Sequence, residues 1–312
     1  MIVVGGEALV DLVEDRDGRR AVAGGGPFNT AVALGRLGVS VGFLGAISRD
    51  DYGTMLASEL RAAAVDTSLI RWSDAGTATA FVERHADGGN RYTFDLADRA
   101  FADLMPADLP SLPPEAWALY LGTLSLAIDP PAAAYEALVE RELGQRKVVL
   151  DPNVRPEIFG DAAVYRRRFA RVARRADVIK LSTDDAAWLY PGLTLSRLLE
   201  TILSLGPRIV AITRGADGAV AATADTSVET GGIRVTVADT VGAGDSFGAA
   251  LIAALLADGA FGPGIDLPPA QAVLDHAVKY AVAASAITCT RAGAVPPTHA
   301  EISRLLGSQP AA

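Results

Sequence analysis

The sequence predicts an α/β protein: a central, mostly parallel sheet flanked by helices in three layers, with a small β-sheet lid. From about residue 115, short and continuously apolar segments alternate with helical segments, which is typical of a parallel sheet covered on both faces. The first third of the chain also alternates strands with helices. Two regions, residues 8–23 and 67–96, have hairpin patterns instead, and we expect them to form the lid.

Glycine and proline bound the elements of the first third: residues 24–27, three glycines and a proline, begin a helix that Gly38 ends. No linker is long enough to separate independent domains, so we expect residues 1–312 to form one domain. The expected strands are Ile2–Gly5, Ala8–Val13, Val41–Ile47, Thr77–Glu83, Arg91–Leu96, Ala118–Leu121, Val148–Leu150, Val178–Leu181, Ile209–Thr213 and Ile233–Val237, and the expected helices are Phe28–Leu37, Tyr52–Ala64, Pro131–Leu143, Ala162–Arg175, Asp184–Leu189, Leu195–Leu205, Ala243–Ala257, Pro269–Ile287 and His299–Leu306.

The charge balance limits the partners of the chain, because 28 basic and 37 acidic side chains give a formal net charge of −9. A field of that sign repels nucleic acid and anionic membranes, so we expect neither as a partner. The single cysteine, Cys289, excludes a disulfide framework, and the longest apolar run, Phe247–Ala257, is too short to span a membrane. We therefore expect a soluble, cytoplasmic protein, with the arginine-rich residues 166–175 forming a solvated helix face.

Residues 239–248 form the most informative motif, because two glycines and an aspartate stand at the start of an alanine-rich helix. Gly242 and Gly244 let the backbone approach a ligand closely, and the helix start offers unpaired N–H groups to an anion. Asp245 is placed beside this anion hole to take a proton from a hydroxyl that attacks phosphorus, and the helix N-terminus favours its ionised form. An aspartate in a first helical turn is also a common structural feature, so two interpretations stay open at this point.

Two other glycine motifs do not fit. A Walker A loop needs a glycine followed by lysine, and no glycine of this chain precedes a lysine. A dinucleotide fingerprint needs a third glycine where Asn29 follows Gly24 and Gly26, and Gly242 lies too late in the chain for such a motif. A nicotinamide-dependent dehydrogenase is therefore disfavoured.

Residues 239–248 resemble the carboxy-terminal signature of the ribokinase/PfkB carbohydrate kinases. Residues 24–31 and 50–53 resemble the amino-terminal signature of the same family, and residues 5–11 and 151–156 are similar to its fructokinase-like branch. The resemblance extends over nearly the whole chain. It implies a ribokinase-like fold and an ATP-dependent sugar kinase, which transfers the γ-phosphoryl group of Mg·ATP to a sugar hydroxyl.

The resemblance implies a role for each matching residue. Asp245 is the implied base for the sugar hydroxyl, and Asn29 and Asp11 are implied sugar ligands, whose amide and carboxylate suit hydroxyl groups. Taken singly, Asn29 also suits a helix cap, Asp11 a turn, and residues 213–218 a plain strand–turn–strand. The implied anion hole is Gly242, Ala243 and Gly244, the implied sugar ligands are Asp11, Gly25, Gly26, Asn29 and Arg155, and the implied nucleotide ligands are Lys180, Thr213, Gly215 and Gly218.

The metal motif of the family is altered in this chain. Members usually carry Asn-x-x-Glu at the start of a helix, where residues 182–185 are Ser-Thr-Asp-Asp. Asp185 is one methylene shorter than the usual glutamate, so we expect it to act on Mg²⁺ through water. Many members also bind a monovalent cation, such as K⁺, through backbone oxygens, although Pro297 replaces a serine of that site. The matching positions are Asp239, Val241, Thr288, Arg291 and Gly293.

Fructose is the expected acceptor, and 2-keto-3-deoxygluconate or another sugar or nucleoside is the alternative. Kinases of 2-keto-3-deoxygluconate typically have Tyr-x-Arg after the lid hairpin, where this chain has residues 92–96 with Asp95. An aspartate there would repel an acid sugar, although Arg99 is close enough to compensate. The lid often forms a dimer contact in this family, so a homodimer is expected. Since the metal motif is altered, a non-catalytic sugar- or nucleotide-binding regulator is the alternative of a different class.

Overall fold

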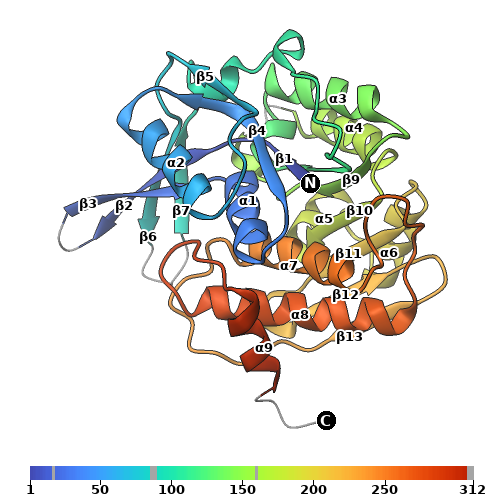
Figure 1. Cartoon of the computed structure of the whole chain (residues 1–312). Helices are drawn as coiled ribbons and strands as arrows, with labels where there is room; N and C mark the ends of the chain where they lie inside the picture. The colour runs from blue at the N-terminus through green and yellow to red at the C-terminus, as the bar shows by residue number, and fades with distance from the viewer. Residues whose placement is uncertain (16–17, 85–89, 159–160, 308–312) are drawn as a thin grey trace.

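The computed structural model describes residues 1–15, 18–84, 90–158 and 161–307, which form two sheets (Figure 1). In the larger sheet β12 (Ala219–Ala222) pairs antiparallel with both of its neighbours, and the other strand pairs are parallel, so β12 runs opposite to the other strands. The order of the larger sheet is β13 (Ser227–Thr230), β12 (Ala219–Ala222), β11 (Ile209–Thr213), β10 (Val178–Ser182), β9 (Lys147–Asp151), β8 (Ala118–Gly122), β1 (Ile2–Gly5), β4 (Val41–Ser48) and β5 (Ile70–Ser73), and that of the small sheet is β3 (Gly18–Gly24), β2 (Leu9–Asp15), β6 (Thr79–Arg84) and β7 (Asn90–Asp95).

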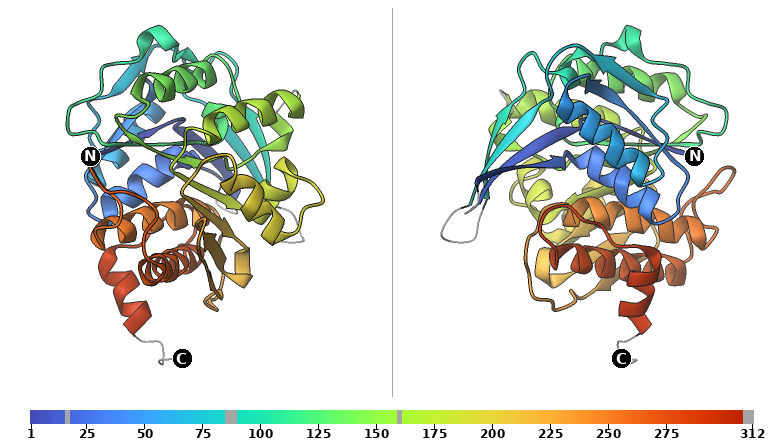
Figure 2. Two further views of the ribbon diagram at one scale, coloured as in Figure 1. Left: turned by 90° about the vertical axis from the view of Figure 1, so that its right-hand side faces the viewer. Right: turned by 60° about the vertical axis from the view of Figure 1, so that its left-hand side comes forward.

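Helices cover both faces of the larger sheet, so the body has three layers (Figures 1 and 2). The small sheet projects from one side of this body (Figure 2). One face is covered by α1 (Gly26–Arg36), α2 (Asp51–Ala62), α7 (Ala243–Ala257) and α8 (Gln271–Cys289), with α9 (His299–Gly307) against α8, and the other face is covered by α3 (Pro131–Glu142), α4 (Ala162–Ala173), α5 (Thr183–Leu189) and α6 (Leu195–Leu203).

The strands are apolar throughout because both of their faces are buried. In β1, Ile2 and Val4 pack into the core that contains α1 and α7, whereas Val3 packs into the core that contains α3 and α4. Successive side chains of a strand point to opposite faces, so continuous apolar runs fill two cores at once. The expected fold class, a mostly parallel three-layer α/β sheet with a small second sheet, is confirmed.

Of the two regions expected to form the lid, the second, residues 67–96, was predicted with boundaries that are too wide. Residues 70–73 form β5, which pairs in parallel with β4 and extends the larger sheet, so among the described residues of the region 67–96 only Thr79–Arg84 and Asn90–Asp95 are strands of the small sheet. Ile70 is buried beside β4, which explains why this strand joins the body. The tips of the two expected hairpins, at residues 16–17 and 85–89, lie outside the described residues.

The strand expected at Ile233–Val237 is not present. The positions beside β11 are taken by β12 and then β13, so this alternating segment finds no partner and runs to α7 as an irregular connection. Val237 is 59% exposed, as expected for an unpaired surface segment.

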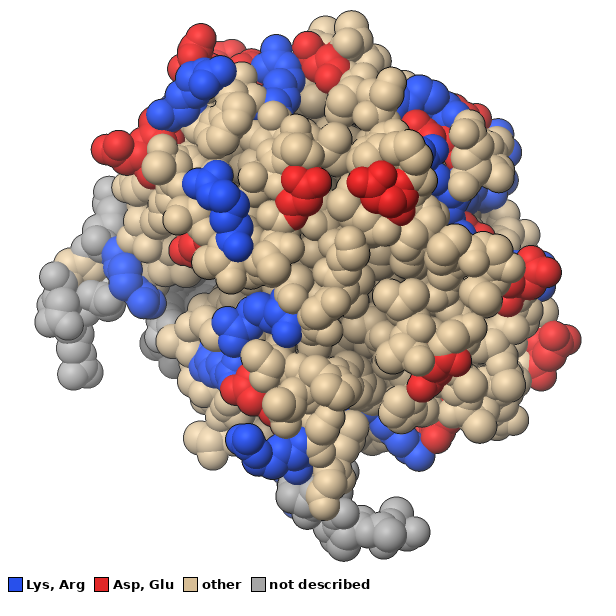
Figure 3. All heavy atoms as spheres, in the orientation of Figure 1, with Lys and Arg blue, Asp and Glu red and all other residues tan. Residues whose placement is uncertain are grey.

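The arginine-rich face of α4 is paired with acidic residues of and beside α3. Arg168 contacts Asp129 and Glu136, and Arg171 also contacts Glu136. Figure 3 shows basic and acidic side chains close together on the face drawn.

Within the described part of the chain, every helix is too short or too polar to cross a membrane.

Candidate active site

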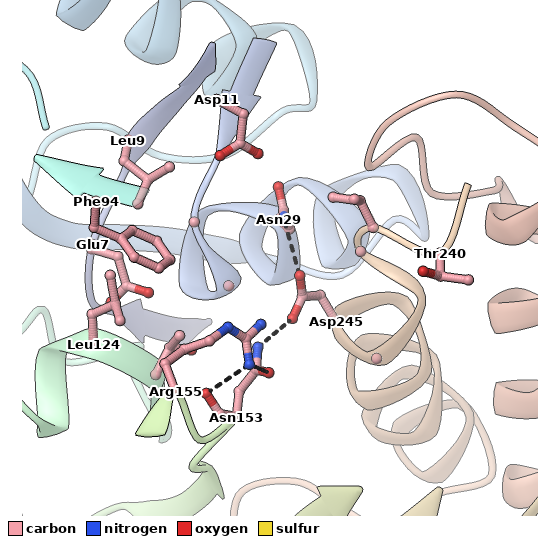
Figure 4. A pocket seen from close by; sticks show the side chains of 16 residues that line it. Glu7, Leu9, Asp11, Asn29, Phe94, Leu124, Asn153, Arg155, Thr240 and Asp245 are labelled. Carbon is pink, nitrogen blue, oxygen red and sulfur yellow. Dashed lines mark hydrogen bonds between the residues drawn. The ribbon is translucent and has the colours of Figure 1, made fainter. Parts of the chain in front are cut away.

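A pocket of about 260 Å³ lies between the small sheet and the starts of α1 and α7 (Figure 4). Such crevices at the carboxyl ends of parallel strands are the usual ligand sites of open α/β sheets. Polar side chains reach the pocket from the segment after β8, from the segment after β9, and from the start of α7 with the residues before it. The lining residues are Glu7, Leu9, Asp11, Gly25, Gly26, Asn29, Phe94, Thr123, Leu124, Asn153, Arg155, Thr240, Val241, Gly242, Gly244 and Asp245.

Asp245 lies in the first turn of α7 and is only 6% exposed. Its Oδ2 accepts a hydrogen bond of 2.9 Å from Asn29 Nδ2, and its Oδ1 lies 3.5 Å from Asn153 Nδ2 (Figure 4). Burial raises the pKa of Asp245, although Lys180, Asn29 and Arg155 lower it. The helix N-terminus favours the ionised carboxylate, as expected from the sequence, but desolvation has the larger effect on this pKa. A base with a raised pKa accepts a proton more readily near neutral pH.

The turn before Asp245 approaches its neighbours closely. Gly242 has φ +74°, and a Cβ there would lie 2.5 Å from Cβ of Ala294. A Cβ on Gly244 would lie 2.9 Å from Lys180 Nζ, so an ammonium group stands directly behind the helix start. The N–H of Ala243 donates to the Thr240 carbonyl at 3.3 Å, which leaves the following turn of backbone to face an anion.

The five expected sugar ligands, Asp11, Gly25, Gly26, Asn29 and Arg155, all line the pocket. Asn29 does not cap α1, because its amide contacts Asp245 and the cap residue is Gly25. Asp11 lies inside β2 rather than in a turn, and burial together with the charge of Asp239 raises its pKa to about 7. Arg155 is oriented by a 2.7 Å hydrogen bond from its guanidinium to Asn153 Oδ1.

Several lining residues had no role assigned from the sequence. Glu7 is buried, and its Oε2 accepts hydrogen bonds from Ser125 N at 3.1 Å and Ser125 Oγ at 2.6 Å. Burial raises the pKa of Glu7 to about 7 against these hydrogen bonds. Glu7 and Asn153 belong to the two short motifs of the fructokinase-like branch, which was the available signal for them. The others are Leu9, Phe94, Thr123, Leu124 and Thr240.

Asp95 does not contribute the charge to the acceptor site that we expected to repel an acid sugar. Asp95 forms an ion pair with Arg99 and does not line the pocket. Its neighbour Phe94 faces the pocket instead, because adjacent residues of β7 point to opposite faces (Figure 4). This segment therefore contributes an apolar wall to the site rather than a repelling charge.

The expected nucleotide ligands lie beside the pocket, on the next strands of the sheet. Lys180 is the third of the five residues of β10 and is only 3% exposed, and its Nζ donates to Asp151 Oδ2 at 2.9 Å. Thr213 ends β11 opposite Ser182 of β10. Gly215 and Gly218 lie in the turn between β11 and β12, at the same edge of the sheet.

Asp185 is already used by protein donors. One of its oxygens accepts from Val154 N at 2.7 Å, and the other accepts from Ser182 N at 2.8 Å and Ser182 Oγ at 2.7 Å. This carboxylate completes a capping box for α5, so it suits an outer contact with Mg²⁺ through water rather than direct coordination. Among the described residues no cluster of three or more His, Cys, Asp and Glu could hold a metal ion.

The residues expected around a monovalent cation lie in the loop before α7, at the end of α8 and in the loop that follows α8. Asp239 joins them, because its carboxylate accepts from Val241 N and from Gly293 N, each at 3.1 Å. Thr288 is fully buried at the end of α8, and Arg291 follows it with its N–H on the Thr288 carbonyl at 3.1 Å. The guanidinium of Arg291 is directed away, to the carbonyls of residues 295 and 296 and to Glu301.

The fold and the site define a kinase of small molecules, with a buried carboxylate beside a helix start that can bind a phosphoryl group. The sequence model of the "pfkB family carbohydrate kinase" matches residues 1–301. The chain belongs to this family. The expectations of PfkB membership and of an ATP-dependent sugar kinase are thereby confirmed.

Several relatives are similar to this chain over most of their length. A fructokinase of Rhizobium leguminosarum bv. trifolii is 39% identical over 264 residues, covering 83% of this chain and 80% of the relative. A fructokinase of Salmonella typhimurium is 30% identical and covers 93% of each chain. Among solved structures, a double mutant of Vibrio cholerae O395 fructokinase with fructose, ADP and potassium ion superposes with a TM-score of 0.87 at 27% identity, covering 98% of this chain and 97% of the other. An aminoimidazole riboside kinase from Salmonella enterica reaches 0.84 at 27% identity, covering 98% and 99%.

Proposed function

We propose that this protein is a fructokinase, which transfers the γ-phosphoryl group of ATP to a hydroxyl of fructose. The observation that carries the proposal is the buried Asp245, held by Asn29 at the start of α7 in a pocket lined by hydroxyl-binding groups. The similarity to named fructokinases supports the choice of sugar.

Asp245 is proposed as the general base. Its carboxylate removes the proton of the acceptor hydroxyl, whose oxygen then forms the bond to the γ-phosphorus as the bond to the ADP oxygen breaks. The N–H groups of Gly244 and Asp245 at the start of α7 face the negative charge that develops on the phosphoryl oxygens, because the N–H groups of Ala243 and Ser246 already donate to backbone carbonyls. Asn29 fixes the orientation of the base, because its amide can only donate to the carboxylate at that position.

The charge of the pocket favours a neutral acceptor. Glu7, Asp11 and Asp245 line it against a single guanidinium, that of Arg155. An acid sugar would add another carboxylate to this set, which costs free energy in a site of low dielectric constant. Fructose brings hydroxyl groups, which the carboxylates and Asn29 can bind, and Phe94 offers an apolar wall to a sugar ring.

The cofactor residues are part of the same proposal. Lys180, Thr213, Gly215 and Gly218 are proposed to face the nucleotide, and Mg²⁺ on the phosphates would neutralise charge during transfer, with Asp185 touching its water shell. The two loops joined by Asp239 are proposed to hold K⁺ through backbone oxygens.

The small sheet is proposed as a lid that excludes water from the acceptor site, and also as the contact of a homodimer. The proposed location of the protein is the cytoplasm.

The test is ADP release from Mg·ATP in the presence of fructose, 2-keto-3-deoxygluconate, ribose, tagatose or adenosine. We expect the highest kcat/KM with fructose, and a fall in kcat by about 10²–10⁴-fold in Asp245→Asn. A higher kcat/KM with another acceptor would reject fructose but keep the kinase. Full activity of Asp245→Asn would reject the assigned base, and an inactive wild-type protein that binds sugar would favour the non-catalytic regulator.

A further inference from the structure

A buried ion pair lies directly beneath the first turn of α7. Lys180 of β10 and Asp151 of β9 are joined by a 2.9 Å contact, and their side chains are only 4% and 5% exposed. Neither residue lines the pocket. The pair therefore belongs to the layer behind the site, between the sheet and the helix that carries Asp245.

A favourable contribution to the free energy of folding does not explain this ion pair. Removing two charges from water costs several kcal/mol per ion, and a buried pair repays that cost only when the remaining lone pairs are also satisfied. Asp151 Oδ1 is buried without a hydrogen-bond partner among the described residues. Its Oδ2 has one short contact, to Lys180, and a long one of 3.5 Å from Tyr120 OH. An unsatisfied buried carboxylate of this kind points to a functional reason for keeping the charge.

Lys180 lies against the turn that begins α7 and carries Gly244. A Cβ added to Gly244 would lie 2.9 Å from Lys180 Nζ, which places the ammonium against the backbone of the anion hole. Burial by itself would lower the pKa of Lys180, but the carboxylates of Asp151, Asp185 and Asp245 raise it. The lysine consequently stays protonated, and Asp151 Oδ2 accepts a hydrogen bond from its Nζ at 2.9 Å.

We propose that Asp151 is a positioning residue, whose carboxylate fixes the Lys180 ammonium behind the start of α7 before the phosphoryl group arrives. The inference rests on the proposed role of this turn in phosphoryl transfer. Because the ammonium is already in place, no side chain has to reorganise when negative charge builds up, which is the condition under which electrostatic stabilisation is largest. Asp151 acts through Lys180 and touches neither sugar nor nucleotide.

The test is a double-mutant cycle on kcat and on the KM for the sugar, with wild type, Asp151→Asn, Lys180→Met and the double variant. We expect Lys180→Met to lower kcat by about 10²–10³-fold, the range found for loss of one donor at an oxyanion site. Asp151→Asn should lower kcat by about tenfold or more with little change in the KM for the sugar. In the Lys180→Met background, Asp151→Asn should have no further effect, because residues that act as one unit are not additive.

Tyr120→Phe is the matched control. It removes the other polar neighbour of Asp151 Oδ2 but keeps the ion pair, and it should leave kcat near the wild-type value. Urea unfolding of each variant separates loss of folding from loss of positioning. If Asp151→Asn does not fold, Asp151→Glu carries the test, because it keeps the charge of the ion pair but moves the carboxylate by one methylene. In folded Asp151→Glu kcat should fall with little change in the KM for the sugar, and an unchanged kcat would overturn the inference.

Two results would overturn the inference while leaving the kinase intact: an unchanged kcat in folded Asp151→Asn, or effects of the two substitutions that multiply. A loss caused by Tyr120→Phe of the same size as that of Asp151→Asn would also overturn it, because the ion pair would then not be the cause. Wild-type protein without sugar-dependent ADP release would instead overturn the proposed function.

Discussion

Replacing Glu7 by glutamine should make the stability of the protein less sensitive to pH. Burial raises the pKa of Glu7 from 4.5 to about 7, so between these values the folded chain holds a proton that the unfolded chain has released. Stability therefore falls as pH rises through this window and levels off above the folded pKa. At about 1.36 kcal/mol per unit, the rise corresponds to roughly 3 kcal/mol of unfolding free energy lost by pH 8.

The measurement is urea unfolding of wild type and Glu7→Gln at several pH values from 4 to 8. The introduced glutamine cannot ionise, yet its amide oxygen can still accept from Ser125, so the two proteins should be close in stability at pH 4. At pH 8 the variant should be more stable by up to about 3 kcal/mol. Other buried carboxylates titrate in both proteins and cancel in the difference. A difference between the two proteins that stays constant from pH 4 to 8 would refute the reasoning.

Three further predictions concern catalysis. Asn29→Ala removes a hydrogen bond that lowers the pKa of Asp245, so the acidic limb of the kcat/KM profile should move to higher pH, and an unmoved limb would contradict this assignment. Gly244→Ala places a Cβ 2.9 Å from Lys180 Nζ, so steady-state kinetics should show kcat reduced by about 10²-fold in a protein that still folds; a change in KM alone would count against the anion hole. Phe94→Ala removes an apolar wall and should raise the KM for the sugar by about tenfold with kcat nearly kept, whereas an unchanged KM would place the sugar elsewhere.

The sequence predicted the body of the fold because its parallel strands are short, apolar and separated by helices. The same reasoning missed β5 and overestimated residues 233–237, since pairing depends on which sheet edge is free, and a single segment carries no information about its neighbours. Signature residues predicted that Asp245 and Asn29 belong to the site, and both line the pocket. Asp151 was not assigned a role, because its meaning comes from contact with Lys180 on the adjacent strand.

Electrostatics was the least predictable part of the site. A helix start by itself suggests a lowered pKa for Asp245, and only the burial of the side chain in the fold reverses the direction. In the same way, Asp95 and Phe94 are neighbours in sequence, and only the registry of β7 decides that the aromatic ring faces the pocket.

The pairing of β2 with β6 has a consequence for the order in which this protein folds. Val10 pairs with Thr79, so the centre of the small sheet closes a loop of roughly 70 residues, whereas the hairpins β2–β3 and β6–β7 are local. Local contacts form early, and the entropy of closing the long loop delays the joining of the two hairpins until the intervening segments have folded. During folding, the pocket wall formed by Leu9 and Phe94 is therefore completed late. During unfolding, the small sheet separates first, so the pocket opens before the central sheet is lost.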